Sequence, residues 1–469
     1  MKVEQIYTGC LAEAAYYIQS KGEAVIIDPL RETAPYIERA KKDEASIKYI
    51  FLTHFHADFV SGQVDLARKT GAKIVLGPSA KAAYDFHEAK DQELFHVGDI
   101  SFVWLHTPGH TLESSTILLK DESGTDVCIF TGDTLFIGDV GRPDLAVKQG
   151  DLTENDLAGL LYDSLRNKIM PLADAVTVYP GHGAGSACGK KMSKETFDTL
   201  GHQKEVNYAL RSDMTKEEFI EEVLTGLTPP PQYFPENVRM NKGINTSIDD
   251  IIKSGTRPLS TVEFKSKVSK GALMLDVRHQ KDFVKAHIPG SIFIGLDGGF
   301  APWVGALIPN IRQEIVLIVS KDRAGEAVTR LSRIGYDNSV GYLAEGIEGW
   351  KAEGNELDSI KTISAEDFAK EVTATKYPVL DVRKEGEYDS EHLVDAIHEP
   401  LDTIHFNMDN LDADKTYYVH CAGGYRSVIF ESILKSRGYH NLIDVLGGYG
   451  AIKKVDSLQR TDFVCPSTL

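Results

Sequence analysis

Six histidine and aspartate side chains lie in short motifs that could bind a metal ion. His54, His56 and Asp58 form a TH-x-H-x-D motif, and three more follow in PGHT, TGDT and YPGHG, namely His110, Asp133 and His182. Imidazole and carboxylate groups are ligands of zinc, iron and manganese. Structural zinc sites usually contain cysteine, and none of the cysteines lies in a suitable place for one. The ordered set therefore predicts a catalytic metal centre rather than six unrelated side chains.

The strands predicted around these motifs would bring the six side chains together. Short β-rich runs precede the motifs, and most of them end in Asp or His: AVIID (24–28), IKYIFLTH (47–54), AKIVLG (72–77), ISFVWLHT (100–107), VCIFTGD (127–133) and AVTVYPGH (175–182). Side chains that follow strand ends converge along one edge of a sheet, where catalytic groups are common. The proline-rich segment 226–243, GLTPPPQYFPENVRMNKG, predicts an extended connector after this region.

The motifs in residues 1 to 245 resemble those of the metallo-β-lactamase superfamily, which usually has H-x-H-x-D-H. Here Phe59 occupies the last position. In binuclear members such as glyoxalase II that last histidine binds the second metal, so the resemblance favours a single metal in this chain. Five segments are similar specifically to persulfide dioxygenases that are fused to rhodaneses: LAEAAYYI, THFHADFVSG, PGHTLESST, TGDTLFIGDVGRPDL and YPGHGAGSACGK.

The resemblance implies one iron(II) per chain, because that family uses mononuclear non-haem iron. Position by position, it implies that the ligands are His54, His110 and Asp133, and that three further residues orient bound water and ligands: His56, Asp58 and His182. A facial set of two histidines and one carboxylate leaves three positions open on iron(II). Persulfide sulfur and O2 can take two of them, and the expected products are sulfite and free thiol.

Two further residues near these motifs could contact substrate. Arg142, in GDVGRPD, resembles the position that binds the carboxylate of the thiol carrier in glutathione-using relatives, although a guanidinium could equally brace the loop. Cys188 follows His182 in a glycine-rich stretch and could relay sulfur, but a small packed thiol is the alternative. Cys10, Cys128 and Cys465 are predicted to be structural.

A second chemical motif lies near the carboxyl end of the chain. The segment YYVHCAGGYRSVIFESILKSRGY (417–439) predicts a strand, a tight loop and a helix, with Cys421 where the strand ends. Gly423 and Gly424 let the loop turn its N–H groups inward, and the helix dipole and Arg426 add positive charge. Such a cradle favours a thiolate and binds an oxyanion. The C-x4-R spacing resembles that of rhodanese sulfurtransferases, whereas the related phosphatases have C-x5-R.

The chain repeats itself after the predicted connector. LMLDVRHQKDFVKAHIPGSI (273–292) resembles VLDVRKEGEYDSEHLVDAI (379–397), which predicts two α/β domains. Ser320 aligns with Cys421, and its loop KDRAGE is two residues shorter. A serine hydroxyl cannot carry sulfane sulfur, so the first copy is predicted to be an inactive rhodanese-like domain. Spacing, dimer contacts in a homo-oligomer, or shaping of the entrance to the iron remain open as its role.

Composition limits the classes of partner. The net charge of −18 over 469 residues argues against a general nucleic-acid or anionic-membrane binder, since both need a positive surface. The amino terminus has no apolar signal core, and no apolar run approaches the 18 residues of a membrane span. Five scattered cysteines argue against a disulfide scaffold and favour the reducing cytoplasm.

Together these features predict a multidomain α/β protein. The expected domains are an αββα sandwich of the metallo-β-lactamase type over 1–245, an inactive rhodanese-like domain over 246–356 and an active rhodanese domain over 357–469. The expected reaction is oxidation of a low-molecular-weight persulfide of glutathione or another thiol by O2, coupled to sulfur transfer that converts sulfite to thiosulfate. The alternatives are a binuclear zinc thioester hydrolase of the glyoxalase II type and a non-enzymatic persulfide sensor or scaffold.

Overall fold

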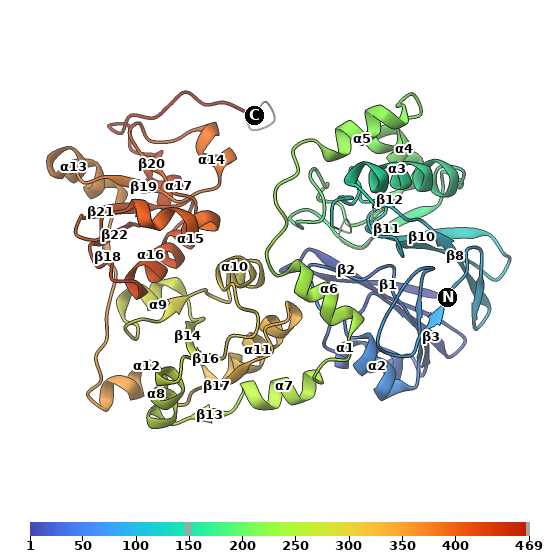
Figure 1. Ribbon diagram of the computed structural model, residues 1–469, viewed down its shortest axis with the longest axis horizontal. Helices are drawn as coiled ribbons and strands as arrows, with labels where there is room; N and C mark the ends of the chain where they lie inside the picture. Colours follow the sequence, from blue (N-terminus) through green and yellow to red (C-terminus); the bar gives the residue numbers. More distant parts are fainter. Residues whose placement is uncertain (146–151, 466–469) are drawn as a thin grey trace. The chain divides into compact units, whose positions relative to one another are not determined.

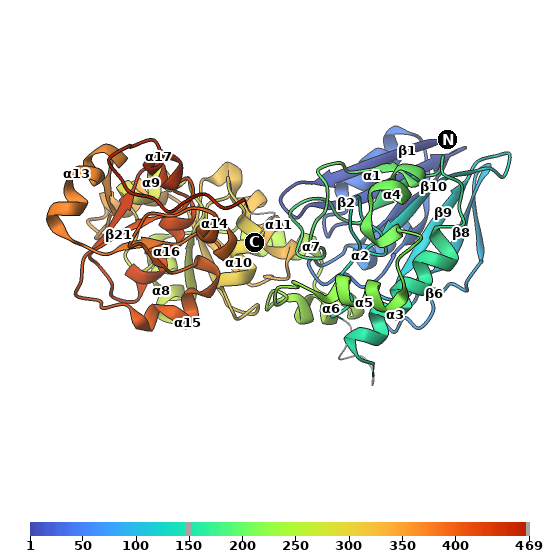
Figure 2. The same ribbon diagram turned by 90° about the horizontal axis from the view of Figure 1, so that it is seen from above.

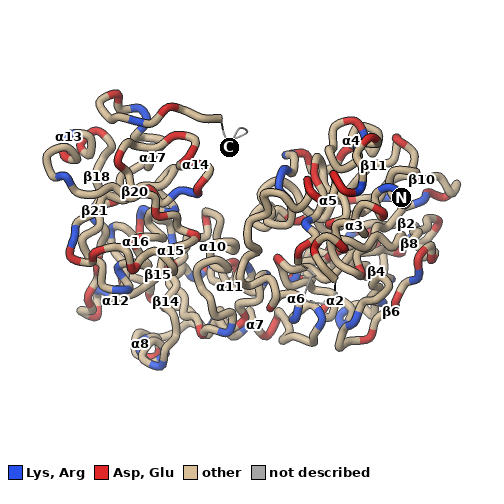
Figure 3. The backbone as a smooth tube through the Cα atoms, turned by 45° about the horizontal axis from the view of Figure 1, so that its top comes forward, with Lys and Arg blue, Asp and Glu red and all other residues tan. Residues whose placement is uncertain are grey.

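A computed structural model of the protein describes residues 1–145 and 152–465. The chain forms two compact units, one of residues 1–248 with 332–335 and the other of residues 249–331 with 336–469. Lys and Arg are interspersed with Asp and Glu along both units (Figure 3). In the described part of the chain, every helix is too short or too polar to cross a membrane.

The first unit contains two six-stranded sheets (Figure 1, and from above in Figure 2). The strands of one sheet, in spatial order, are β1 (Lys2–Thr8), β2 (Glu13–Ser20), β3 (Glu23–Ile27), β4 (Ser46–Phe51), β5 (Lys73–Leu76) and β6 (His87–Glu88). Those of the other are β12 (Asp198–Thr199), β11 (Thr177–Pro180), β10 (Asp126–Gly132), β9 (Ser115–Lys120), β8 (Ile100–His106) and β7 (Leu94–Val97). The predicted strands over residues 24–182 are therefore confirmed, with ends that differ by a few residues.

Side chains alternate between the two faces of each sheet, and both faces are apolar. Along β2, Tyr16 and Ile18 join a core that also contains Phe102 and Phe130 of the second sheet, whereas Tyr17 faces the opposite way. Helices cover the two outer faces: α1 (Ala34–Lys42) and α2 (Gln63–Thr70) on the first sheet, and α3 (Glu154–Ser164) and α5 (Lys216–Leu224) on the second (Figure 1). This arrangement is the predicted αββα sandwich.

The segment predicted to be an extended connector is partly helical, so that prediction was wrong. Residues Phe234–Lys242 form helix α6, and Pro235 lies in its first turn. A proline there loses no helical hydrogen bond, because the first N–H groups of a helix have no partner within it. Only the residues before Tyr233 match the predicted connector. A further helix of this unit, α4 (Leu200–Val206), precedes α5.

The second unit contains two five-stranded parallel sheets with the same strand order. The first has β13 (Pro258–Leu259), β17 (Ser339–Leu343), β16 (Ile315–Ile318), β14 (Leu273–Asp276) and β15 (Ile292–Phe293). The second has β18 (Lys361–Ile363), β22 (Leu442–Val445), β21 (Tyr417–His420), β19 (Val379–Asp381) and β20 (Ile397–His398). The equal order explains the sequence repeat as two copies of one α/β fold.

Helices flank each of these sheets. Those of the first copy are α7 (Ile248–Gly255), α8 (Thr261–Ser269), α9 (Gln280–Lys285), α10 (Phe300–Leu307), α11 (Ala324–Arg333) and α12 (Gly346–Ala352). Those of the second are α13 (Ala365–Thr375), α14 (Glu385–Ser390), α15 (Ile404–Asn407), α16 (Arg426–Ser436) and α17 (Gly448–Ile452). The D-x-R motif braces both copies alike, because Arg278 and Arg383 bind the aspartates two residues before them.

Candidate metal centre and sulfur-transfer loop

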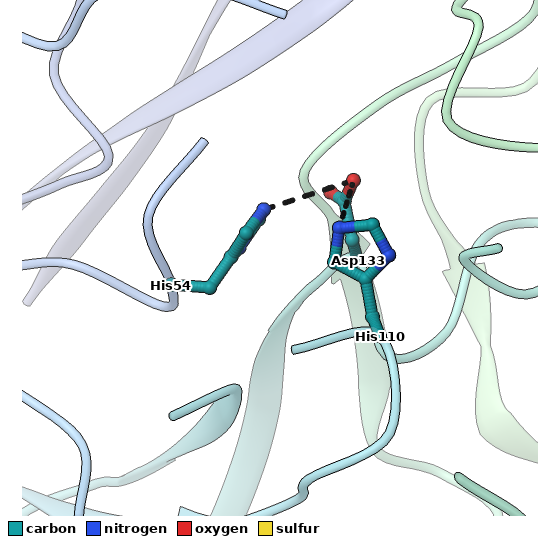
Figure 4. Close-up of side chains that lie close together, drawn as sticks. All are labelled: His54, His110 and Asp133. Atoms are coloured by element: carbon teal, nitrogen blue, oxygen red, sulfur yellow. Dashed lines mark ion pairs between the residues drawn. The ribbon is translucent and has the colours of Figure 1, made fainter. Parts of the chain in front are cut away.

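Three predicted ligands converge in the first unit, each from the loop after a strand. The Oδ2 atom of Asp133 lies 3.8 Å from Nε2 of His54 and 3.5 Å from Nε2 of His110 (Figure 4). All three side chains are buried, and their candidate ligand atoms lie within 4.8 Å of one another. Strands β8, β10 and β11 run in the same direction, so His110, Asp133 and His182 follow strand ends at one edge of the second sheet.

Hydrogen bonds fix both histidines in the tautomer that a metal needs. The Thr53 hydroxyl donates to Asp28 at 2.7 Å, so its oxygen accepts a hydrogen bond from Nδ1–H of His54 at 3.0 Å. Nδ1 of His110 lies 2.8 Å from the carbonyl oxygen of Arg142, which can only accept. In both rings the proton therefore stays on Nδ1, and the lone pair of Nε2 faces Asp133.

The electrostatics of the pocket suit a cation. Burial, together with the neighbouring imidazoles, holds the pKa of His54 well below its usual value, so the ring is neutral. Both carboxylate oxygens of Asp133 are buried and accept no hydrogen bond from any residue that the structure describes. Since buried polar atoms are normally paired, these atoms fit a set of metal ligands.

A second group of predicted residues lies beside this triad. Nε2 of His182 is 3.5 Å from Asp58 Oδ2 and 3.5 Å from Asp133 Oδ1, and Nε2 of His56 is 3.2 Å from Asp28 Oδ1. Although burial lowers the pKa of His56, the Asp28 carboxylate raises it above its usual value. The Phe59 ring packs on His56 with ring centroids 4.2 Å apart and ring planes tilted by 31°, so a hydrocarbon ring fills the last position of the H-x-H-x-D-H motif.

Two glycines let the loops approach the triad closely. A Cβ atom on Gly141 would lie 2.0 Å from the backbone oxygen of Asp133, and one on Gly181 would lie 2.7 Å from its Oδ1 atom. Any side chain at either position would displace the carboxylate. This explains Gly141 in GDVGRPD and Gly181 in YPGHG, neither of which has a positive φ.

Asn241 of α6 holds the loop that carries the first three metal-motif residues. Its Nδ2 donates to the carbonyl oxygens of His56 and Phe59 at 2.8 and 2.7 Å, and its Oδ1 accepts from the Ser61 N–H at 2.8 Å. Sequence reasoning missed this residue, because it lies in the segment predicted to be a connector and is far from His56 along the chain. Its burial and its place in a helix are visible only in the structure.

Arg142 has a carboxylate partner from its own chain. Its guanidinium binds both oxygens of Asp144 at 2.6 Å and donates to the carbonyl oxygens of Thr228 and Ala187. These contacts are those of a loop brace, the alternative that the sequence left open. A substrate carboxylate would have to compete with Asp144.

Cys188 lies at the metal site. Its Sγ atom is within 4.8 Å of ligand atoms of Asp133 and His182, and the side chain is buried. Burial, reinforced by Asp58 and Asp133, raises the pKa of this thiol well above its usual value. The thiol is therefore protonated in the metal-free site.

Cys421 directly follows strand β21 in the second unit and lies in a tight loop. The Gly424 N–H points at its Sγ atom at 3.1 Å, and Gly424 has a φ of 95°, which favours glycine. The loop after β22 holds the same backbone: Tyr449 N–H donates to the Cys421 carbonyl, and a Cβ on Gly448 would lie 2.3 Å from that oxygen. Gly448 and Tyr449 were not predicted.

Arg426 begins α16 and carries the predicted positive charge of the loop. Its guanidinium forms two hydrogen bonds with Glu387 of α14, at 2.5 and 2.8 Å. Although burial raises the pKa of Glu387, Arg426 lowers it below its usual value. Gly423 is exposed, and nothing lies within 4 Å of a Cβ built on it, so the outer part of the loop is accessible.

The first copy has no comparable loop. Ser320 is exposed after β16, and Lys321–Arg323 form a short helical turn that leads directly into α11. Because this loop is two residues shorter than the Cys421 loop, it does not curve around the side chain of Ser320 as the longer loop curves around Cys421. Arg323 instead binds Asp297 and Glu326.

Comparisons with known proteins match these parts of the chain. Residues 8–182 match the metallo-beta-lactamase superfamily, and residues 260–353 and 364–454 each match the rhodanese-like domain. A probable hydroxyacylglutathione hydrolase of Schizosaccharomyces pombe is 31% identical over 198 residues, which are 41% of this chain and 72% of the relative. Human mitochondrial persulfide dioxygenase ETHE1 is 31% identical over 229 residues, which are 48% of this chain and 81% of the relative.

A solved structure extends the similarity over most of the chain. The crystal structure of a metallo-beta-lactamase from Staphylococcus aureus subsp. aureus COL is 32% identical, covers 73% of this chain and 98% of its own, and superposes with a TM-score of 0.64. These findings confirm the predicted fold class and the predicted fusion. The chain belongs to the metallo-β-lactamase superfamily, and it joins one domain of that superfamily to two rhodanese-like domains.

Proposed function

We propose that the first unit is a persulfide dioxygenase that uses one iron(II), held by His54, His110 and Asp133. The observation that carries the proposal is the buried set of two Nε2 lone pairs and one carboxylate without a hydrogen-bond donor among the described residues, together with Phe59 in the last motif position. When bound there, iron(II) supplies open coordination positions and electrons for the reaction of a persulfide with O2. The balanced reaction is RSSH + O2 + H2O → RSH + SO3²⁻ + 2H⁺.

The neighbouring residues have roles that follow from their contacts. His56, Asp58 and His182 would orient the ligands and bound water, because they cluster beside the triad and His182 lies 3.5 Å from Asp133. Cys188, as a protonated thiol, would line the space beside the metal where the substrate binds. Arg142 would shape that space through its carbonyl oxygen and its loop, and would bind a glutathione carboxylate only by exchanging it for Asp144.

The second unit is proposed to transfer sulfur through Cys421. The thiolate attacks the outer sulfur of thiosulfate, the S–S bond of thiosulfate breaks, and sulfite leaves: CysS⁻ + SSO3²⁻ → CysSS⁻ + SO3²⁻. The Gly424 N–H stabilises negative charge on the cysteine sulfur, and the dipole of α16 adds to this effect. In the opposite direction, a persulfide on Cys421 passes its outer sulfur to sulfite and gives thiosulfate.

The rival function is a thioester hydrolase with two zinc ions. It is favoured by the hydroxyacylglutathione hydrolase relatives and by the second group of donors, His56, Asp58 and His182. Phe59 weighs against it, because its ring packs on His56 where a further ligand would be needed. The fused rhodanese-like domains also favour a substrate that contains sulfane sulfur.

The experiment is anaerobic purification with metal analysis, followed by oxygen uptake on glutathione persulfide. We expect about one iron per chain and sulfite as product. His110→Ala should lose both iron and oxygen uptake, whereas His96→Ala, on the exposed side of β7, should keep both. Two tightly bound zinc ions per chain without oxygen uptake would contradict the proposal.

A further inference from the structure

The Cys421 loop touches the inactive rhodanese-like copy through Tyr425. The Tyr425 hydroxyl donates to the carbonyl oxygen of Gly295 at 2.7 Å. Its ring packs edge-on against Phe293 of β15, with ring centroids 5.9 Å apart. Tyr425 directly precedes Arg426, so the contact lies within the loop rather than on a distant surface.

The surface of the inactive copy that contacts Tyr425 has no room for a side chain at Gly298. A Cβ atom on Gly298 would lie 2.3 Å from the nearest ring atom of Tyr425. Gly298 has no positive φ, so its backbone does not require glycine. Glycine is needed at this position because the ring of the other copy lies against it.

Other residues of the inactive rhodanese-like copy hold the segment Gly295–Gly299 in place. Arg323, in the turn that replaces a cradle, binds Asp297 at 2.9 Å, and Arg330 donates to the carbonyl oxygen of Leu296 at 2.7 Å. The two copies are also joined beside it, because the Phe293 N–H donates to the Ser432 hydroxyl of α16 at 2.9 Å (β15 and α16 in Figure 3).

We propose that the inactive rhodanese-like domain is a positioning element for the Cys421 loop, with Tyr425 as the positioning residue. The inference rests on the proposed sulfurtransferase activity of Cys421. One side of the loop is fixed by the backbone around Gly448, whereas its outer residues, Ala422 and Gly423, are exposed. The Tyr425 anchor fixes the other side, and so keeps the loop N–H groups aligned with the sulfur oxyanion.

The test compares two glycine variants of the full-length protein in thiosulfate-to-thiol sulfur transfer. Gly298→Ala places a methyl group into the Tyr425 ring, and the KM for thiosulfate should rise about tenfold with a fall in kcat. Gly299→Ala is the matched control, because its Cβ would meet only Trp303, at 3.4 Å, and its KM should stay at the wild-type value. A general loss of folded protein would lower kcat alone.

A double variant separates this contact from other effects. Tyr425→Ala removes the ring, so adding Gly298→Ala to it should cause no further change in KM. Wild-type KM in Gly298→Ala, equal effects of both glycine variants, or additive effects in the double variant would overturn the inference alone. A wild-type protein that transfers no sulfur from thiosulfate would overturn the proposed sulfurtransferase function, and the inference with it.

Discussion

Thr53 determines which nitrogen of His54 is available to a metal. Its hydroxyl accepts from Nδ1 of His54 only because the hydroxyl proton is donated to Asp28. The chain Asp28–Thr53–His54 is buried throughout, so water does not substitute for it. At His110 the backbone carbonyl oxygen of Arg142 accepts the hydrogen bond from Nδ1, and no side-chain substitution can remove that oxygen.

Thr53→Val should therefore weaken iron binding about 10- to 100-fold, since the ring loses the partner that fixes its tautomer. Thr53→Ser keeps the hydroxyl and should retain wild-type affinity. Anaerobic competition with a chelator measures both. Equal iron affinity in the valine and serine variants would show that the hydroxyl does not orient His54.

Helix α6 holds the loop that carries His54, His56 and Asp58 against the rest of the first unit. Asn241→Ala would leave the buried carbonyl oxygens of His56 and Phe59 and the Ser61 N–H without their partner. The unfolding free energy of the first unit should fall by about 3 kcal/mol, and iron affinity should fall with it.

The matched control is Asn245→Ala, which removes a single hydrogen bond to Met240 and should cost about 1 kcal/mol. Denaturant unfolding of both variants checks the difference. If the two variants unfold alike, Asn241 does not hold the loop.

Strand β22 carries a buried carboxyl group beneath the sulfur-transfer loop. Burial raises the pKa of Asp444 from 3.8 to about 6, although the Ser427 hydroxyl lowers it slightly. Between these two values the folded state binds more protons than the unfolded state, so stability falls as pH rises. The loss amounts to about 3 kcal/mol above pH 6.

Asp444→Asn removes this titration. Relative to wild type, the variant should gain about 2 kcal/mol of stability between pH 4 and pH 7, whatever the difference in stability between the two proteins at pH 4. Paired unfolding curves at the two pH values measure the change. A difference between the proteins that does not depend on pH would contradict the assignment of the raised pKa to Asp444.

The sequence predicts local elements of this fold well and distant contacts poorly. The clustering of the six metal-motif residues could be predicted because they lie in loops that follow strands whose apolar pattern is local. Helix α6 was missed because the prolines around Pro235 favour extended structure in isolation, whereas the first turn of a helix accepts one. Tyr425 on Gly295 could not be predicted, since 130 residues separate the partners and neither carries a local signal.

At the scale of the whole molecule, the proposed functions combine an oxidation that would release sulfite with a loop suited to pass sulfur to sulfite. A tether raises the effective concentration of one site's product at the other to roughly the millimolar range. Wild type supplied with persulfide and O2 should therefore accumulate thiosulfate, and Cys421→Ser should stop at sulfite. Ser320→Ala, in the inactive copy, should behave as wild type.

Sulfite and thiosulfate must be followed together, with correction for the uncatalysed reaction of sulfite with persulfide. Equal thiosulfate from wild type and Cys421→Ser would mean that the fusion does not couple the two reactions. Loss of oxygen uptake in Cys421→Ser would mean that the two sites are not chemically separate.

We propose that the metal site oxidises persulfide rather than hydrolysing a thioester. The most direct measurement gives one metal-free preparation either iron(II) or zinc(II), and offers each form glutathione persulfide with O2 and, separately, a hydroxyacylglutathione. We expect the iron form to consume one O2 for each persulfide and to release sulfite, and we expect neither form to cleave the thioester. Thioester cleavage by the zinc form, with no oxygen consumption by the iron form, would contradict this proposal.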